Sequence, residues 1–160
     1  MKRIVERMPG GWLKIHTPAY NDRARAVNHP GLTDAELVQV VIDRHQMTDY
    51  FIIEDSAPGT DAFLRDRDFR DAWEAPTGEL AVNMAKARSI VMAQIRRVRN
   101  LELAALDVPF VQALESGDTE AQIAIGAKKQ VLRDIPQTFH LTARTPSQLK
   151  NLWPDELPRK

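Results

Sequence analysis

The four histidines are the side chains in this chain that are best suited to acid–base or metal chemistry. They are His16, His29, His45 and His140, and they lie far apart in the sequence. None belongs to a metal-ligand spacing such as HExxH. Isolated histidines of this kind usually lie at the surface or at the end of a helix or strand. We therefore interpret all four in that way and predict no metal site from them.

The other motifs of catalysis are also missing. The chain has no cysteine, which excludes thiolate nucleophiles, disulfides and Cys-ligated zinc. Gly10-Gly11 lacks the GxxxxGK spacing of a phosphate-binding loop, and no serine lies in a GxSxG elbow. We therefore predict that the protein is not an enzyme, with no catalytic residue, no bound metal and no cofactor.

Alternating acidic and basic residues occupy positions 65–71. Asp66 and Asp68 begin the spacing of a calcium loop, but Arg70 stands where the third oxygen ligand would have to be. We interpret this run as a solvated surface with local ion pairs.

A second charged segment is basic throughout. Residues 86–99 contain no acid and carry the basic residues Lys86, Arg88, Arg96, Arg97 and Arg99. On a helix these side chains spread over a wide polar arc, which is typical of an ordinary solvated face. The alternative is docking on an acidic partner, to which arginine can donate in a bidentate manner. The candidate partner-binding residues are Arg88, Arg96, Arg97 and Arg99.

Trp153 is the fifth candidate for partner binding. It lies in a charged segment next to Pro154, with few apolar neighbours in the sequence. It could anchor in a groove of a partner, or it could pack back onto the body of the protein. Trp12 and Trp73 are instead predicted to pack in the core.

The overall charge argues against two classes of partner. The 160 residues contain 22 basic and 22 acidic residues, giving a formal net charge of zero. Proteins that coat nucleic acid or lie on anionic membranes usually have a basic excess, and no aromatic residues interleave with the arginines here. Zero net charge also gives little protection against self-association, which favours a protein that works within an assembly.

No targeting or membrane segment is expected either. No stretch approaches the roughly 18–20 apolar residues of a membrane span. Residues 1–7 lack the apolar core of a signal peptide. We therefore expect the protein to stay in the cytoplasm where it is made, or to be carried in a particle assembled there.

The first part, residues 1–82, is predicted to be a small α+β domain. Met8–Gly11 is a turn between strands near residues 3–5 and 12–15, because glycine accepts positive φ without steric cost. A polar loop over 20–30 follows. Thr33 and Glu36 form a capping box for a helix that reaches about residue 46. Tyr50–Ile53 is then predicted to be a buried strand, and Leu80 and Val82 a return strand.

The second part, residues 83–136, is predicted to be an antiparallel helical hairpin. Its first helix, capped by Asn83, has an apolar stripe and reaches about Leu106. After a break near 107–109, a short helix capped by Asp107 and reaching about Glu115, or a kinked continuation, follows. Gly117 ends the hairpin's first arm and Asp118 caps the second, which should end before Pro136. The apolar positions are Ala87, Val91, Ile95, Val98, Leu101 and Ala105, then Ile123, Ala124, Ala127, Val131 and Leu132. Residues 137–160 are predicted to be an extended tail with a capped turn at 145–149.

Several stretches resemble proteins encoded in the tail gene regions of tailed bacteriophages and prophages. In chain order they are Asp66–Trp73, Val82–Arg88, Leu103–Asp107, Gly117-Asp118 and Lys129–Pro136. Lys129–Pro136 with Trp153-Pro154 is also similar to the C-terminal part of tail-fibre assembly proteins. The resemblance covers about residues 66–136. It implies a non-catalytic role in the tail, with tail-tip or fibre proteins as partners, and it carries over no catalytic residue.

Three hypotheses follow. The chain is a structural or adaptor component of a phage tail, at the tail tip or at the fibre attachment, and is found in the virion tail. Alternatively, it is a tail-fibre assembly chaperone that leaves before the particle matures. A third class is a small phage regulator that binds a host protein or nucleic acid. A homo-oligomer is compatible with each of them.

Overall fold

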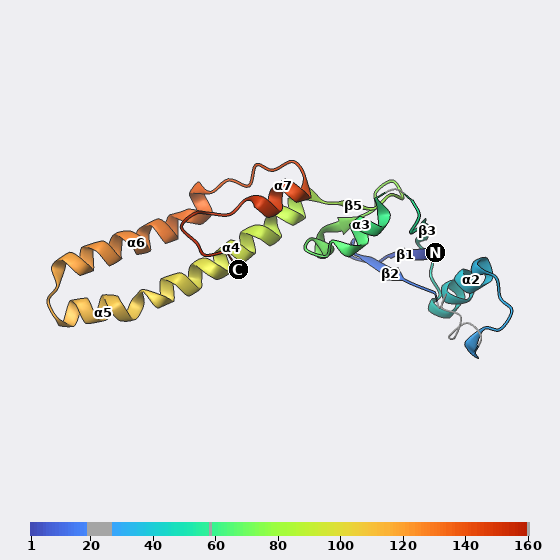
Figure 1. Ribbon diagram of the computed structural model, residues 1–160, viewed down its shortest axis with the longest axis horizontal. Helices are drawn as coiled ribbons and strands as arrows, with labels where there is room; N and C mark the ends of the chain where they lie inside the picture. Colours follow the sequence, from blue (N-terminus) through green and yellow to red (C-terminus); the bar gives the residue numbers. More distant parts are fainter. Residues whose placement is uncertain (19–26, 58, 160) are drawn as a thin grey trace. The chain divides into compact units, whose positions relative to one another are not determined.

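The computed structural model describes residues 1–18, 27–57 and 59–159 of the chain. It contains both strands and helices, which confirms the predicted α+β class (Figure 1). The chain divides into two compact units, which are Met1–Asn83 and Met84–Lys160. None of the helices in the described part of the chain is long and apolar enough to cross a membrane.

A three-stranded antiparallel sheet forms the centre of the first unit. Its strands are β1 (Lys2–Arg7), β2 (Leu13–His16) and β3 (Tyr50–Glu54), in the order β2-β1-β3. The predicted hairpin is confirmed, since Val5 of β1 pairs with Ile15 of β2. Gly10 and Gly11 both have positive φ, as this turn requires. Only β1 has strand neighbours on both sides, and its Ile4 and Val5 are fully buried.

Helix α2 (Asp34–His45) covers one face of this sheet. Its predicted capping box is present, because the Thr33 side chain accepts from the Glu36 amide and Glu36 reaches back to the Thr33 amide. Val38 and Ile42 of α2 pack with Ile4 and Met47 in a buried apolar cluster.

The chain between residues 60 and 82 covers the other face. It forms α3 (Thr60–Arg65), the short 3₁₀ helix η1 (Arg70–Ala72), and the paired strands β4 (Trp73–Glu74) and β5 (Ala81–Val82). The return strand at Val82 is thus confirmed, whereas α3 was not predicted. Trp73 is buried as expected and its ring lies 5.1 Å from that of Phe63. Leu13 and Ile15 of β2 line a small cavity together with Trp73.

Two burial predictions in this unit were wrong. Strand β3 forms, but its Ile52 is 46% exposed. Ile52 pairs with Ile4 and therefore lies on the α2 side of the sheet, but β3 is an edge strand and the apolar cluster under α2 is built on Ile4 of the central strand. Trp12 is 50% exposed, because it belongs to the turn before β2 rather than to a strand. Most of the predicted loop over 20–30 lies outside the described residues.

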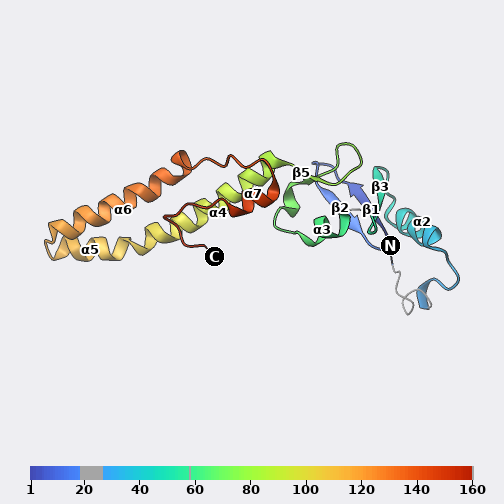
Figure 2. The same cartoon turned by 45° about the horizontal axis from the view of Figure 1, so that its top comes forward.

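Over its described residues, 84–159, the second unit forms four helices: α4 (Met84–Ala105), α5 (Asp107–Glu115), α6 (Thr119–Thr138) and α7 (Pro146–Asn151). Helix α6 runs back along α5 and α4, so the predicted hairpin is present (Figures 1 and 2). Ala87, Val91, Ile95 and Val98 of α4 are buried. The predicted stripe is therefore correct over the first four turns of this helix.

The two joints of the hairpin follow local rules. The predicted break separates α4 from α5, but Leu106 occupies the cap position, and Asp107 lies in the first turn and binds Lys129 at 2.5 Å. At the far end Gly117 has φ +68°, and the amides of Gly117 and Asp118 donate to the carbonyls of Leu114 and Ala113. This is a Schellman motif. Asp118 then accepts from the Ala121 amide as the predicted cap of α6.

Helix α6 does not end before Pro136, as the sequence predicted, but continues to Thr138. Proline lacks the N–H that would bond to the carbonyl four residues earlier, so it removes one hydrogen bond. The last turn persists because the Phe139 amide donates to the Ile135 carbonyl and Ile135 is buried.

The segment after α6 is extended as predicted except for α7, which forms at the predicted capped turn. The Thr145 hydroxyl accepts from the Gln148 amide at 3.2 Å. The segment also packs: α7 contacts α4, Leu149 has no exposed surface, and Pro154 and Leu157 are buried. The tail is therefore part of the helical unit's core.

Candidate functional site

Two of the predicted arginines line a groove on the helical unit. Arg88, Met92 and Arg96 are four residues apart on α4, so they share one side of the helix. The chain that leaves α6 runs past this side and forms the opposite wall of an open groove of about 540 Å³. The lining is completed by Ser89, Pro136, Phe139, His140, Leu141 and Thr142. We call this the arginine groove.

The groove combines positive charge with an apolar wall. Arg88 donates from Nη2 to the Ala143 carbonyl at 2.8 Å, which holds its guanidinium in place. The exposed Arg96 side chain makes no hydrogen bond or ion pair with the described residues. None of the described residues that line the groove is acidic, and Met92, Phe139 and Leu141 supply apolar surface. Such a surface fits a segment that carries both carboxylates and apolar side chains.

The other two predicted arginines are not brought to this groove. Arg97 is exposed on α4 but does not line it. Arg99 is half-buried, and its Nε is buried without a hydrogen-bond partner in the described structure. A buried unpaired donor costs about 1–3 kcal/mol. The basic run therefore divides into a groove pair, one solvated residue and one partly buried residue.

Trp153 lies within the folded tail. Its indole is half-buried, and Nε1 donates to the Leu157 carbonyl at 3.2 Å. The indole N–H is therefore already hydrogen-bonded within the tail, next to the buried Pro154 and Leu157, and it stabilises the last turn of the chain. The geometry favours packing onto the body over an exposed anchor.

A second surface was missed because its residues were expected to be buried. In the outer half of the hairpin, Leu101 is 51%, Val131 49% and Ile123 69% exposed. We call this surface the apolar face and define it by residues with helical spacing on α4–α5 and on α6: Leu101, Ala105, Val108, Ile123, Ala124, Ala127 and Val131. The predicted stripes were wrong here because two helices bury only the strip between them.

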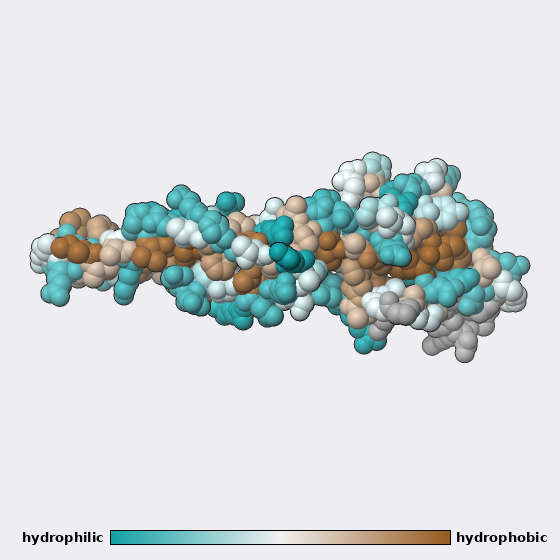
Figure 3. All heavy atoms as spheres, turned by 90° about the horizontal axis from the view of Figure 1, so that it is seen from above, coloured by the Kyte–Doolittle hydropathy of each residue, from teal (hydrophilic) through white to brown (hydrophobic). Residues whose placement is uncertain are grey.

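Residues from both helices meet in a shallow groove on this face. Ala105 of α4 and Ala127 and Val131 of α6 line a space of about 440 Å³, with Glu102 and Lys128 beside them. Glu156 of the tail closes one end. Figure 3 shows brown, hydrophobic residues gathered over the helices of the hairpin. Exposed apolar side chains rimmed by charges are typical of protein contact surfaces.

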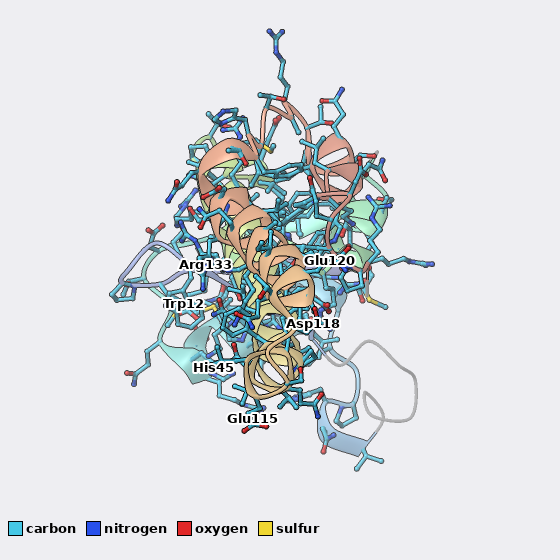
Figure 4. All side chains as sticks on the ribbon, turned by 90° about the vertical axis from the view of Figure 1, so that its left-hand side faces the viewer. Trp12, His45, Glu115, Asp118, Glu120 and Arg133 are labelled. Atoms are coloured by element: carbon cyan, nitrogen blue, oxygen red, sulfur yellow. The ribbon has the colours of Figure 1, made fainter. Side chains whose placement is uncertain are left out.

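The turn at the tip of the hairpin is acidic. Glu115, Asp118 and Glu120 lie around it (Figure 4). The Asp118 carboxylate is already used as the cap of α6. Across the described residues, no group of three or more His, Asp or Glu side chains could hold a metal ion. The acidic turn is thus explained by capping and solvation.

His16 lies at the end of β2, as predicted, but its side chain is not at the surface. Its side chain is 8% exposed, its Nε2 lies 2.9 Å from Glu6 Oε2, and its ring centroid is 4.7 Å from that of His45. His16 is paired with Ile4, so both side chains lie on the side of the sheet that α2 covers. The pairing with Glu6 explains this histidine as a structural residue.

Comparisons with protein-family models, with curated proteins and with solved structures found no match to the chain.

Proposed function

We propose that this protein is a non-enzymatic adaptor of a bacteriophage tail, at the tail tip or the fibre attachment, that acts through protein contacts. The placement in a tail rests on the resemblance of residues 66–136. The contact chemistry rests on the arginine groove. Arg88 and Arg96 line it together with apolar side chains, and none of the described residues that line it is acidic. That groove is the observation that carries the proposal.

The partner segment follows from the groove's chemistry. Arg96 has no protein partner among the described residues, so a carboxylate bound there gains a charge-assisted hydrogen bond without breaking an existing ion pair. Arg88 is already positioned by the Ala143 carbonyl, which reduces the ordering cost of binding. Met92 and Phe139 accept an apolar side chain beside the acid. The partner is therefore a tail protein that presents an acidic segment with interspersed apolar residues.

A peptide in which glutamates alternate with leucines, labelled with fluorescein, tests the groove. Arg96→Glu should weaken its binding by about tenfold or more, since it replaces attraction by repulsion. Arg97→Glu is the matched control, because it makes the same charge change one residue away and outside the groove. Equal binding by the wild type and by Arg96→Glu would refute the site.

Mass spectrometry of purified virions tests the place of the protein. We expect the chain in the particles of the phage that encodes it. The similarity of Lys129–Pro136 and Trp153-Pro154 to tail-fibre assembly proteins favours a second candidate, an assembly chaperone. A chain that is present in the infected cell with fibre proteins, but absent from the particles, would replace the adaptor by the chaperone.

A further inference from the structure

We propose that two copies of this chain associate through the apolar face, so that their hairpins form an antiparallel four-helix bundle. This contact is separate from the arginine groove and uses other residues. It assigns the second copy as the occupant of the space beside Ala105 and Ala127.

The first argument is that the outer half of the hairpin has almost no core of its own. Among the described residues between Val98 and Leu132, only Ala113 is a buried hydrophobic residue. Over the same stretch, Leu101, Val108 and Ile123 are more than half exposed. A helical layer needs a second layer to bury an apolar face. A second hairpin supplies that layer and completes a four-helix bundle.

The second argument is shape. Ala105, Ala124 and Ala127 are small and exposed, so they allow the backbones of two copies to approach closely. Leu101 and Val131 stand beside them as larger side chains. Alternating large and small residues on facing helices interdigitate, which is the packing that such bundles require.

The third argument is charge, and it selects a second copy. Glu102 on α4 and Lys128 on α6 flank the apolar groove, and neither side chain makes an ion pair or hydrogen bond with the described residues. A two-fold axis parallel to the helices sets α4 of one copy against α6 of the other. Glu102 of each copy then faces Lys128 of the other, and the pair occurs twice. The Glu102 and Lys128 positions are therefore complementary across the two-fold axis, whereas Glu156 lies at the end of the groove. The zero net charge of the chain adds no overall repulsion.

The size of the surface sets the expected strength. About 15 residues of each hairpin arm span roughly 22 Å, and two helices side by side are roughly 20 Å wide. This projected area, roughly 450 Å² per copy, is at the low end for a specific interface. We therefore expect a dimer with a dissociation constant in the micromolar range.

Sedimentation velocity on the full chain, from about 1 to about 300 µM, tests the contact across this range of affinities. We expect reversible dimer formation. Ala127→Glu, which places a charge at the centre of the face, should raise the dissociation constant at least about tenfold. Ala93→Glu is the control: it is the same substitution at an exposed α4 position outside the face, and it should leave dimerisation unchanged.

A charge exchange tests the two-fold geometry without touching the apolar side chains. Glu102→Lys should weaken the dimer, and Glu102→Lys combined with Lys128→Glu should restore it. Circular dichroism of each variant checks that the helices are retained. A chain that stays monomeric to the highest concentration overturns the proposal, even if the peptide still binds the arginine groove. A dimer that is indifferent to both Ala127→Glu and the charge exchange also overturns it.

Discussion

Replacement of Leu149 tests whether the C-terminal segment is part of the helical unit. Leu149 lies in α7, has no exposed surface, and belongs to the helix that packs on α4. Leu149→Ala removes about three carbon groups from this contact. At about 0.8 kcal/mol for each group, the transfer term alone is roughly 2.4 kcal/mol. The cavity left behind brings the expected cost to about 3 kcal/mol, within the range of buried leucine truncations.

Hydrogen–deuterium exchange reports this cost locally. A loss of about 3 kcal/mol raises the open population of the docked tail by roughly a hundredfold. Amides over residues 149–157 whose exchange is protected by docking should therefore exchange about a hundredfold faster, while the amides in the middle of α4 should change much less. Urea denaturation followed by circular dichroism should show a lower midpoint with little change in slope if the whole unit unfolds together.

Leu101→Ala is the matched control for this prediction. It is the same substitution in the same unit, but Leu101 is 51% exposed. It should cost about 1 kcal/mol or less when measured at a protein concentration too low for dimers. If Leu149→Ala were no more damaging than Leu101→Ala, the docking of the tail on α4 would be wrong.

Three further predictions concern single positions. Gly117→Ala should lower the free energy of unfolding by about 1 kcal/mol, because Gly117 has φ +68°. Gly126→Ala should raise it by up to about 1 kcal/mol, because Gly126 lies inside α6 with open space around it. Urea denaturation of both variants should show these opposite signs. The pKa of Asp55 lies below its ordinary value mainly because Arg3 donates to its carboxylate. This stabilisation is present above about pH 3.9 and is lost as the pH falls through the lower folded-state pKa. Arg3→Gln should raise the pKa of Asp55, measured by NMR titration, and an unchanged pKa would refute the cause. Val98→Asp should unfold the helical unit, because it places a carboxylate in the buried strip of α4, and an unchanged circular dichroism melt would show that the buried side is assigned wrongly.

Features that depend on neighbours in the sequence were predictable. The Thr33–Glu36 capping box, the glycine turn before β2 and the Gly117-Asp118 joint each depend on a few consecutive residues. Their hydrogen bonds close over three to five residues, so the order of side chains is sufficient to identify them. The longer helices follow for the same reason, since periodicity reports which side chains share a face, whereas the six-residue α3 is too short to show a period and was not predicted.

Burial was only partly predictable. Val98 and Leu101 continue one apolar stripe on α4, yet the first is buried and the second is half exposed. Periodicity gives the angle of a side chain around its helix, and it contains no information about which segment covers that angle. The cover depends on where α6 and the returning tail lie.

The same distinction applies to the candidate site. The sequence alone identified a basic, acid-free run on a helix with an apolar side, and it predicted a hairpin as the element that carries the run. Only the tertiary structure separated Arg88 and Arg96 from Arg97 and Arg99, because the chain after α6 passes one side of α4. Beside the arginine groove, the helical unit also presents the apolar face, whose residues the sequence predicted to be buried. Local order determined the hairpin, and long-range packing decided which of its sides a partner can reach.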